Sequence, residues 1–248
     1  MTDDTVIKAG LDIGSTTAKI VLLDTDGRRV FSDYRRHHAD ICGAVLSFLE
    51  QVAEKSPRVC LNLNLTGSAA LDLSEKLGLS FVQEVVATHF LVRNRWPDVR
   101  CAMDIGGEDS KMIFFDPRRP PDIRMNGSCA GGTGSFIDQM AALLNVSPSE
   151  FNRLAAGHAH IYPVASRCGV FAKTDVQNML SRNISHEDIS ASVFHAVAVQ
   201  CINSLARGMT IRPKLLVCGG VLSFLPELLN RFLDLLGFSR SDLVIPER

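Results

Sequence analysis

The sequence predicts an α/β protein built from two similar subdomains. Segments with strand periodicity alternate with segments of helical periodicity, which is typical of layered α/β folds. A short motif also occurs twice, as Asp12-Ile13-Gly14 and as Asp104-Ile105-Gly106. In both copies a lysine and a second aspartate follow at matching offsets, namely Lys19 and Asp24 in the first and Lys111 and Asp116 in the second. An internal repeat of this kind indicates duplication, and we expect subdomains at residues 1–98 and 99–248.

The expected elements can be placed in order along the chain. A meander of three strands opens the sequence at residues 8–13, 19–23 and 29–34, and a helix at 41–55, a strand at 59–65 and a helix at 86–95 follow. After the second motif we expect helices at 136–144, 148–156, 171–181 and 187–209, a buried strand at 215–218, a helix at 224–236 and a strand at 243–245. The proline-containing segment 118–121 is predicted to be a solvated loop between strands. Each subdomain thus begins with a hairpin whose turn faces a cleft between the two, where ligands usually bind.

Composition narrows the class of protein. With 248 residues, of which 46% are hydrophobic, the chain is long enough to bury a core. A net charge of -1 gives no basic field, so nucleic acid is not an expected partner. The polar start and the lack of an apolar run of roughly 20 residues predict a soluble, cytoplasmic protein without a membrane partner.

The turn of the first motif has the composition of a phosphate-binding loop. Gly14 permits close backbone approach, Ser15, Thr16 and Thr17 supply hydrogen-bond donors, and Lys19 supplies positive charge. Asp12 is expected to hold Mg²⁺ through water, since Mg²⁺ keeps much of its hydration and prefers carboxylates together with substrate phosphates.

The second motif is expected to bind the other end of the phosphate chain. Gly106 and Gly107 form its turn, and Asp104, helped by Glu108, would orient the attacking water. Gly219 and Gly220 follow a buried strand and would let adenosine lie against the backbone. A single Asp-x-Gly turn is usually an ordinary hairpin, but two copies with a further Gly-Gly turn favour nucleotide binding. The Walker pattern is not present, which excludes a P-loop.

Two of the seven cysteines differ from the others. Cys129 lies in a glycine-rich turn before a predicted helix, and Cys168 lies at the start of another, so both thiols are placed at helix N-termini that favour an anionic centre. We also count Gly132 and Thr133, in the turn after Cys129, among the cofactor-binding residues. The cysteines could be incidental or form a redox disulfide. Two thiolates are too few for a 4Fe-4S cluster, but a twofold dimer would supply four.

Together these segments resemble the ATPase activators of 2-hydroxyacyl-CoA dehydratases and the ATPase subunits of benzoyl-CoA reductase. The resemblance is carried by residues 12–19, 104–111, 126–134 and 168–172. It implies a duplicated fold of the acetate and sugar kinase, chaperone and actin type, with ATP or ADP, Mg²⁺ and a 4Fe-4S cluster that Cys129 and Cys168 share across a homodimer. It also implies transfer of a low-potential electron to an acyl-CoA dehydratase or reductase, with ferredoxin or flavodoxin as donor.

Two departures from that pattern are visible. Glu108 stands where the smaller activators often carry Gln, and the sequence around Cys168 is closer to the large multidomain activase-like proteins. The strand expected at 243–245 is not followed by the closing helix that the resemblance leads us to expect, which suggests a fragment of a longer protein.

Two other functions use the same phosphate turns. A sugar or small-molecule kinase would need a catalytic carboxylate on a substrate hydroxyl and would leave Cys129 and Cys168 unexplained. A non-enzymatic nucleotide switch would treat those cysteines as structural. The histidines, including His37 and His195, show no metal-binding spacing and are interpreted as loop or surface residues.

Overall fold

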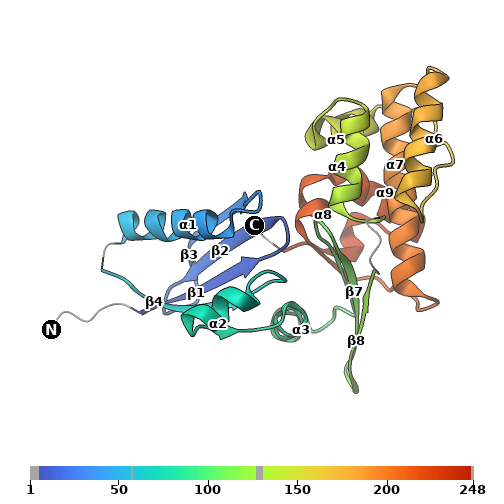
Figure 1. Cartoon of the computed structure of the whole chain (residues 1–248). Helices are drawn as coiled ribbons and strands as arrows, with labels where there is room; N and C mark the ends of the chain where they lie inside the picture. The colour runs from blue at the N-terminus through green and yellow to red at the C-terminus, as the bar shows by residue number, and fades with distance from the viewer. Residues whose placement is uncertain (1–5, 57, 127–130, 247–248) are drawn as a thin grey trace. The chain divides into compact units, whose positions relative to one another are not determined.

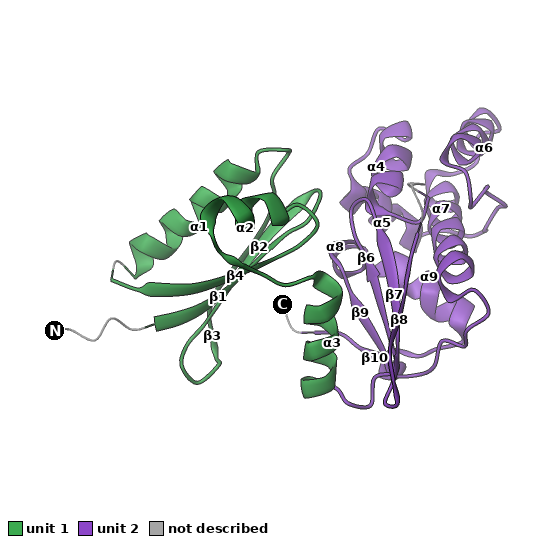
Figure 2. Ribbon diagram, turned by 60° about the horizontal axis from the view of Figure 1, so that its bottom comes forward, with its two compact units in different colours: residues 1–95 green, residues 96–248 purple. Residues whose placement is uncertain are grey.

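The chain divides into two compact units, Met1–Arg95 and Trp96–Arg248 (Figure 2). The structure, a computed structural model, describes residues 6–56, 58–126 and 131–246. Each unit contains one five-stranded sheet.

Unit 1 has the strand order β3-β2-β1-β4-β5. Its elements are β1 (Val6–Ile13), β2 (Thr17–Leu23), β3 (Arg29–Arg36), α1 (Ile41–Lys55), β4 (Cys60–Thr66), α2 (Leu71–Leu77), β5 (Ser80–Phe81) and α3 (Glu84–Arg95). Strand β1 is antiparallel to β2 and parallel to β4. The Asp40 side chain caps α1 by accepting from Gly43 N–H, and Ala44, Phe48 and Val52 recur at helical spacing on its buried face. Figure 1 shows α1 running along the sheet that it covers.

Unit 2 repeats this arrangement with the strand order β10-β9-β6-β7-β8. The strands are β6 (Cys101–Ile105), β7 (Ser110–Asp116), β8 (Arg119–Met125), β9 (Leu215–Cys218) and β10 (Leu243–Val244). The helices are α4 (Gly134–Leu143), α5 (Pro148–Ala156), α6 (Gly169–Ser181), α7 (His186–Cys201), α8 (Gly220–Phe224) and α9 (Pro226–Leu236). Strand β6 is antiparallel to β7 and parallel to β9, as β1 is to β2 and β4. The duplication inferred from the repeated motif therefore extends to the sheet topology.

Several predicted boundaries differ from the observed ones. Residues 119–121 belong to β8 rather than to a loop; β8 is an edge strand, where proline is tolerated because no ladder partner needs its missing N–H. The helix expected at 187–209 ends at Cys201 and continues as a π-helical turn, Ile202–Ala206. The helix expected at 224–236 begins two residues later, as α9 at Pro226, and Phe224 instead ends α8 before a break at Leu225.

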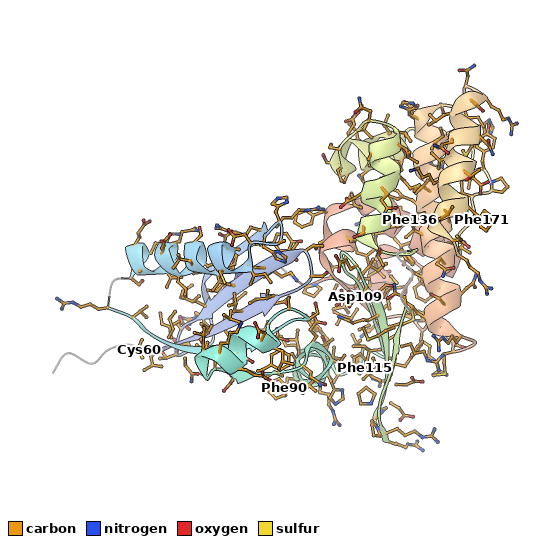
Figure 3. The ribbon with its side chains drawn as sticks, in the orientation of Figure 1. Cys60, Phe90, Asp109, Phe115, Phe136 and Phe171 are labelled. Carbon is orange, nitrogen blue, oxygen red and sulfur yellow. The ribbon has the colours of Figure 1, made fainter. Side chains whose placement is uncertain are left out.

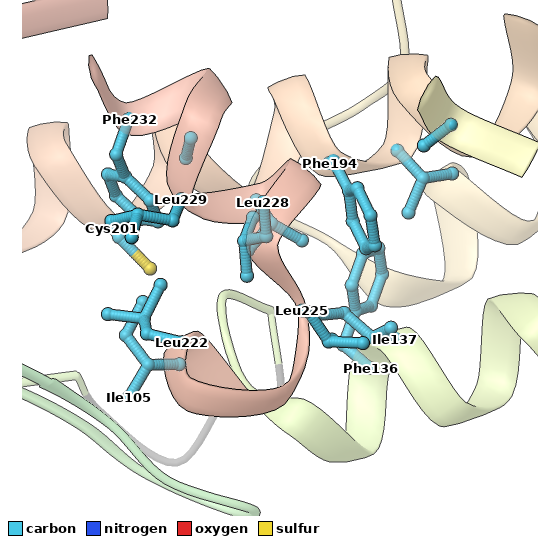
Figure 4. Close-up of a cluster of buried hydrophobic side chains, with 14 of the residues drawn as sticks. Ile105, Phe136, Ile137, Phe194, Cys201, Leu222, Leu225, Leu228, Leu229 and Phe232 are labelled. Carbon is cyan, nitrogen blue, oxygen red and sulfur yellow. The ribbon is translucent and has the colours of Figure 1, made fainter. Parts of the chain in front are cut away.

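Helix α7 is the centre of the unit 2 core. Phe194 is fully buried and meets Phe151 edge to face at a ring separation of 5.3 Å. Figure 4 shows Phe194 and Cys201 of α7 in the same cluster as Leu228 of α9. Among the described helices, the stretch His186–Ala206 is long and apolar enough to cross a membrane, but 67% of its most apolar window is buried inside the protein. That burial accounts for its apolar composition.

Candidate functional site

The turn of the first hairpin is closed by a backbone hydrogen bond from Gly14 N–H to Thr17 O, 2.9 Å long. Asp12 and Lys19 are register partners across β1 and β2, and Lys19 Nζ lies 2.6 Å from Asp12 Oδ2. The other carboxylate oxygen, Asp12 Oδ1, is buried and has no hydrogen-bond partner among the described residues. A buried carboxylate oxygen left in this state is costly, and a metal-bound water would satisfy it, so the residues fit the Mg²⁺ role expected of Asp12.

His37 supports this turn; it lies in the loop after β3, as expected of a loop or surface residue, but it is not at the surface. Its side chain is buried, with 6% exposure, and Nε2 lies 3.0 Å from Gly14 O. Nδ1 accepts from Ala39 N–H at 3.1 Å, so Nε2 carries the proton that is donated to Gly14 O. The following residues His38 and Ala39 have φ values of 47° and 67°, a region that non-glycine residues seldom adopt. The sequence signal was present only as a histidine directly after a strand that borders the hairpin.

The second hairpin has the same turn at the matching position. Gly106 N–H donates to Asp109 O at 2.8 Å, as Gly14 N–H does to Thr17 O. Lys111 is almost fully buried, and its Nζ lies 2.9 Å from Asp109 Oδ2. Glu108 is exposed at the tip of the turn, whereas Asp104 is half-buried at the end of β6. Solvent therefore reaches the Glu108 carboxylate more readily than that of Asp104.

The start of α4 is attached to this second turn by its backbone. Gly134 N–H donates to Gly106 O at 3.0 Å, and Ser135 N–H donates to Gly107 O at 2.7 Å. The preceding residues Gly132 and Thr133 are buried. The Cys201 thiol bonds to Gly132 O at 3.2 Å, and burial raises the pKa of this thiol to about 12. Gly132 and Thr133 therefore lie beside Gly106 and Gly107 in unit 2.

Gly219 closes the same region from the other side. It has φ 89° and ψ 148°, and a Cβ at this position would overlap Asp104 Oδ1 and Ile105 O. Only glycine fits here without displacing the carboxylate. Gly220 begins α8 directly afterwards. Asp104, Gly106, Gly107, Gly132, Thr133, Gly219 and Gly220, which were predicted to share a nucleotide site, thus cluster within unit 2.

Cys168 lies away from these turns, as the N-cap residue of α6, and is half-buried. Val170 and Phe171, in the first turn of α6, are 72% and 67% exposed. Cys129 lies outside the described residues. Within the described part of the chain no three metal-ligating side chains come together.

The irregular segment before Cys168 is held by side chains of α6 and α7. Asp188 Oδ1 accepts from the backbone N–H groups of Ala159 and His160, at 2.7 and 2.9 Å. Ser192 Oγ accepts from Tyr162 N–H, and Asp175 Oδ2 accepts from Ala165 N–H, both at 2.8 Å. The hydrogen bond from His160 N–H is the main reason why the pKa of Asp188 lies below its usual value.

Helix α4 connects the second turn with the Cys168 region. A Cβ on Gly169 would be in van der Waals contact with Phe136, at 3.7 Å from its Cδ2. The aromatic ring of Phe136, on α4, therefore lies directly against the residue that follows Cys168. Figure 3 shows Phe136 on α4 and Phe171 on α6. The backbone bonds from Gly134 and Ser135 lie at the start of the same helix.

The known proteins that are similar to this chain include two dehydratase activators. The chain is 30% identical over 227 residues to the (R)-2-hydroxyglutaryl-CoA dehydratase activating ATPase of Acidaminococcus fermentans, covering 86% of this chain and 82% of the relative. It is 30% identical over 217 residues to the 2-hydroxyisocaproyl-CoA dehydratase activator of Clostridioides difficile, covering 86% and 80%.

Two solved structures also match. Component A of the Acidaminococcus fermentans dehydratase has a TM-score of 0.85 at 26% identity, covering 98% of this chain and 92% of that one. The activator from Clostridium difficile with bound ADPNP has a TM-score of 0.83 at 25% identity, covering 97% and 88%. A putative N-acetylglucosamine kinase from Chromobacterium violaceum, at 15% identity and a TM-score of 0.54, shares the fold alone.

These matches confirm the predicted actin-like ATPase fold and the resemblance that its motifs carry. A family model describing the BadF/BadG/BcrA/BcrD ATPases matches residues 9–234, which include both hairpins, Cys168 and the Gly219-Gly220 turn. The chain therefore belongs to the BadF/BadG/BcrA/BcrD ATPase family.

Proposed function

We propose that this protein hydrolyses ATP and uses the accompanying conformational change to pass a low-potential electron to an acyl-CoA dehydratase or reductase. The observation that carries the proposal is the pair of Asp-Ile-Gly hairpins with the same turn hydrogen bond, in a chain that belongs to an ATPase family. The names of its relatives, which activate CoA-ester dehydratases, supply the partner class.

In the nucleotide site, Asp12 would contact Mg²⁺, and the phosphates would be contacted by Gly14, Ser15, Thr16 and Thr17. The buried, unpartnered Asp12 Oδ1 supports the first assignment. Lys19 is paired with Asp12, so it would act partly by holding that carboxylate in place. Asp104 and Glu108 orient the attacking water, and Gly219 and Gly220 lie against adenosine.

Cys168 would hold a 4Fe-4S cluster together with Cys129, each from two copies of the chain. Such a cluster needs four thiolates and supplies one-electron transfer. Two features support a shared site at this position. Cys168 occupies the N-cap position of α6, where the helix dipole favours negative charge. The exposed Val170 and Phe171 beside it form an apolar surface that a second copy would cover.

The contacts of α4 support a route from nucleotide to cysteine. A change at Gly106 and Gly107 on nucleotide binding moves the start of α4 through the bonds from Gly134 and Ser135. Phe136, two residues beyond Gly134, then acts on Gly169 next to Cys168. ATP is in this proposal a ligand that shifts a conformational equilibrium. Electrons would come from a ferredoxin or flavodoxin, and the protein would work as a soluble cytoplasmic homodimer.

Anaerobic purification with iron and sulfide assays, combined with EPR spectra with and without MgATP, tests the proposal. We expect about one 4Fe-4S cluster per two chains and a spectrum that changes with MgATP. Cys168→Ser should lose iron and keep nucleotide binding, whereas Cys60→Ser, at an exposed cysteine of unit 1, should match the wild type in both. Iron-free wild-type protein with sugar-dependent ATP consumption would instead identify a kinase. If iron-free Cys168→Ser still regulated its partner protein, the chain would instead be a nucleotide switch.

A further inference from the structure

The end of β4 in unit 1 contains a second buried polar atom next to Asp12. Thr66 is the last residue of β4 and the register partner of Asp12 across the parallel pair β1 and β4. Paired residues of neighbouring strands lie about 5 Å apart and point to the same face of the sheet. Thr66 Oγ1, like Asp12 Oδ1, is buried and has no hydrogen-bond partner within the part of the chain that the structure describes.

The Thr66 position is fixed by the turn that follows it. Gly67 has φ 104°, and a Cβ there would overlap backbone atoms of Ile13. Ala69 N–H donates to Ile13 O at 2.9 Å, and Ala70 N–H donates to Gly67 O at 3.1 Å. The turn after β4 is therefore packed and bonded against the residue between Asp12 and Gly14. Thr66 is held beside the phosphate turn by backbone contacts that need glycine at position 67.

The same construction occurs in unit 2, where it forms part of the predicted nucleotide site. Cys218 ends β9 and is the register partner of Asp104, and Gly219 follows with φ 89° and packs against Ile105. Thr66 and Gly67 thus correspond to Cys218 and Gly219 in the duplicated fold. Gly219 was recognised from the Gly-Gly pair in the sequence, whereas its counterpart Gly67 stands alone between Thr66 and Ser68.

Two unsatisfied buried oxygens on neighbouring strands are suited to one shared ligand. At a strand spacing of about 5 Å, a single metal-bound water, whose oxygen is occupied by the metal, can donate one hydrogen bond to the hydroxyl oxygen and the other to the carboxylate. Lys19 already satisfies Asp12 Oδ2, so Oδ1 is the oxygen that remains for this ligand. Resting on the nucleotide role proposed above, we infer that Thr66 is a further positioning residue, whose hydroxyl and Asp12 Oδ1 together hold one water of the nucleotide-bound Mg²⁺.

This role separates the stability of the protein from its affinity for nucleotide. Replacing the Thr66 hydroxyl by a methyl group removes a buried polar group without a partner, so the nucleotide-free protein should lose no stability. The same change removes one hydrogen bond from the hydrated metal, which corresponds to a loss of about 5- to 10-fold in affinity for MgADP. If the hydroxyl served only the fold, its removal would lower the stability of the nucleotide-free protein and leave the affinity for MgADP unchanged.

The test is isothermal titration calorimetry of the anaerobically purified full chain with ADP, in Mg²⁺ and in EDTA, together with the Tm of the nucleotide-free protein. Thr66→Val should weaken MgADP binding about 5- to 10-fold, leave ADP binding in EDTA unchanged and leave the Tm at or above that of the wild type. Thr66→Ser keeps the hydroxyl and should restore MgADP affinity. Thr25→Val, at an exposed threonine in the turn between β2 and β3, is the matched control and should change nothing.

Equal weakening by Thr66→Val in Mg²⁺ and in EDTA, unchanged affinity in both, or a lowered Tm in the absence of nucleotide would each overturn the inference. The last result would show that the hydroxyl holds a structural water. Failure of the proposed nucleotide function is distinguishable, because the wild type itself would then bind no MgADP.

Discussion

Replacing Gly219 by alanine should damage both the stability of unit 2 and its nucleotide site. At φ 89° and ψ 148° Gly219 adopts a conformation that is almost restricted to glycine, which costs an alanine about 1–3 kcal/mol. The added Cβ also overlaps Asp104 Oδ1 and Ile105 O, and it would lie 2.8 Å from the Ile105 carbonyl carbon. Because two of these atoms are backbone, relief requires movement of the end of β6 as well as rotation of Asp104.

Gly237→Ala is the matched control for the conformational cost. Gly237 ends α9 with φ 65° and ψ 32°, and nothing would lie within 4 Å of a Cβ at that position. The left-handed conformation alone should cost this variant about 1–2 kcal/mol. We therefore expect Gly219→Ala to be destabilised by at least about 1 kcal/mol more than Gly237→Ala, since it adds the steric overlap to the conformational cost.

The measurements are the free energy of unfolding from urea titration and the affinity for MgATP from calorimetry. Gly219→Ala should lose at least about tenfold in affinity through displacement of Asp104, a change of about 1.4 kcal/mol, while Gly237→Ala binds as the wild type does. If the two variants unfold with equal free energies and Gly219→Ala keeps its affinity, the close approach of Gly219 to Asp104 does not exist in solution.

Three further predictions concern titratable groups of unit 2. The pKa of Asp188 is lowered chiefly by the hydrogen bond from His160 N–H, so its contribution to folding stability is present above the unfolded pKa near 3.9 and is lost as the pH falls through the folded pKa. Asp188→Asn should be about 1–2 kcal/mol less stable at pH 7, and its free energy of unfolding, measured by urea titration, should fall less steeply at acid pH. Parallel pH profiles of the two proteins would contradict this. The pKa of His195 is lowered first by burial and then by Arg231, so the unfolded state binds the proton more readily and stability should fall as the pH drops below about 6.5. His195→Gln should remove that part of the pH dependence, and an unchanged profile would refute it. Burial raises the pKa of Cys101 and Cys201 to about 12. Mass spectrometry after iodoacetamide treatment at pH 8 should therefore find these two thiols unmodified, while the exposed Cys42 and Cys60 react. Rapid labelling of Cys201 in the folded protein would exclude the buried environment.

The hairpins could be predicted from sequence because the residues that specify them lie close together in the chain. Strand periodicity and a glycine turn lie within a dozen residues of each other, and the turn bonds from Gly14 and Gly106 follow from that short segment. His37 could not be identified in the same way. Its role depends on β3 lying beside β2, which brings the residue after β3 back to Gly14, and nothing in its immediate sequence distinguishes a buried ring from an exposed one.

The split of the long apolar segment 187–209 was missed for a similar reason. Continuous apolar composition predicts one buried helix, and it does not report where the backbone changes from α to π geometry. The boundary at Cys201 coincides with the contact of its thiol with Gly132 O, a partner 69 positions earlier in the chain. Such a contact is set by the packing of α7 against the loop before α4 and is invisible to periodicity.

The correspondence between Thr66-Gly67 and Cys218-Gly219 was missed for another reason, namely the different spacing along the chain in the two units. The same difference explains how the two copies of the duplicated fold could acquire different roles. In unit 1 the hairpin is separated from the parallel strand β4 by β3 and one helix, α1, whereas in unit 2 β8 and the helices α4 to α7 stand between the hairpin and β9. This difference in spacing conceals the repeat from sequence comparison, although the strands pair in the same order. The additional segment is also the one that contains Cys168. Because its first helix is bonded to Gly106 and Gly107 through main-chain N–H groups, side-chain substitutions on α4 leave that connection intact, while a change at Phe136 alters the contact with Gly169 at its other end.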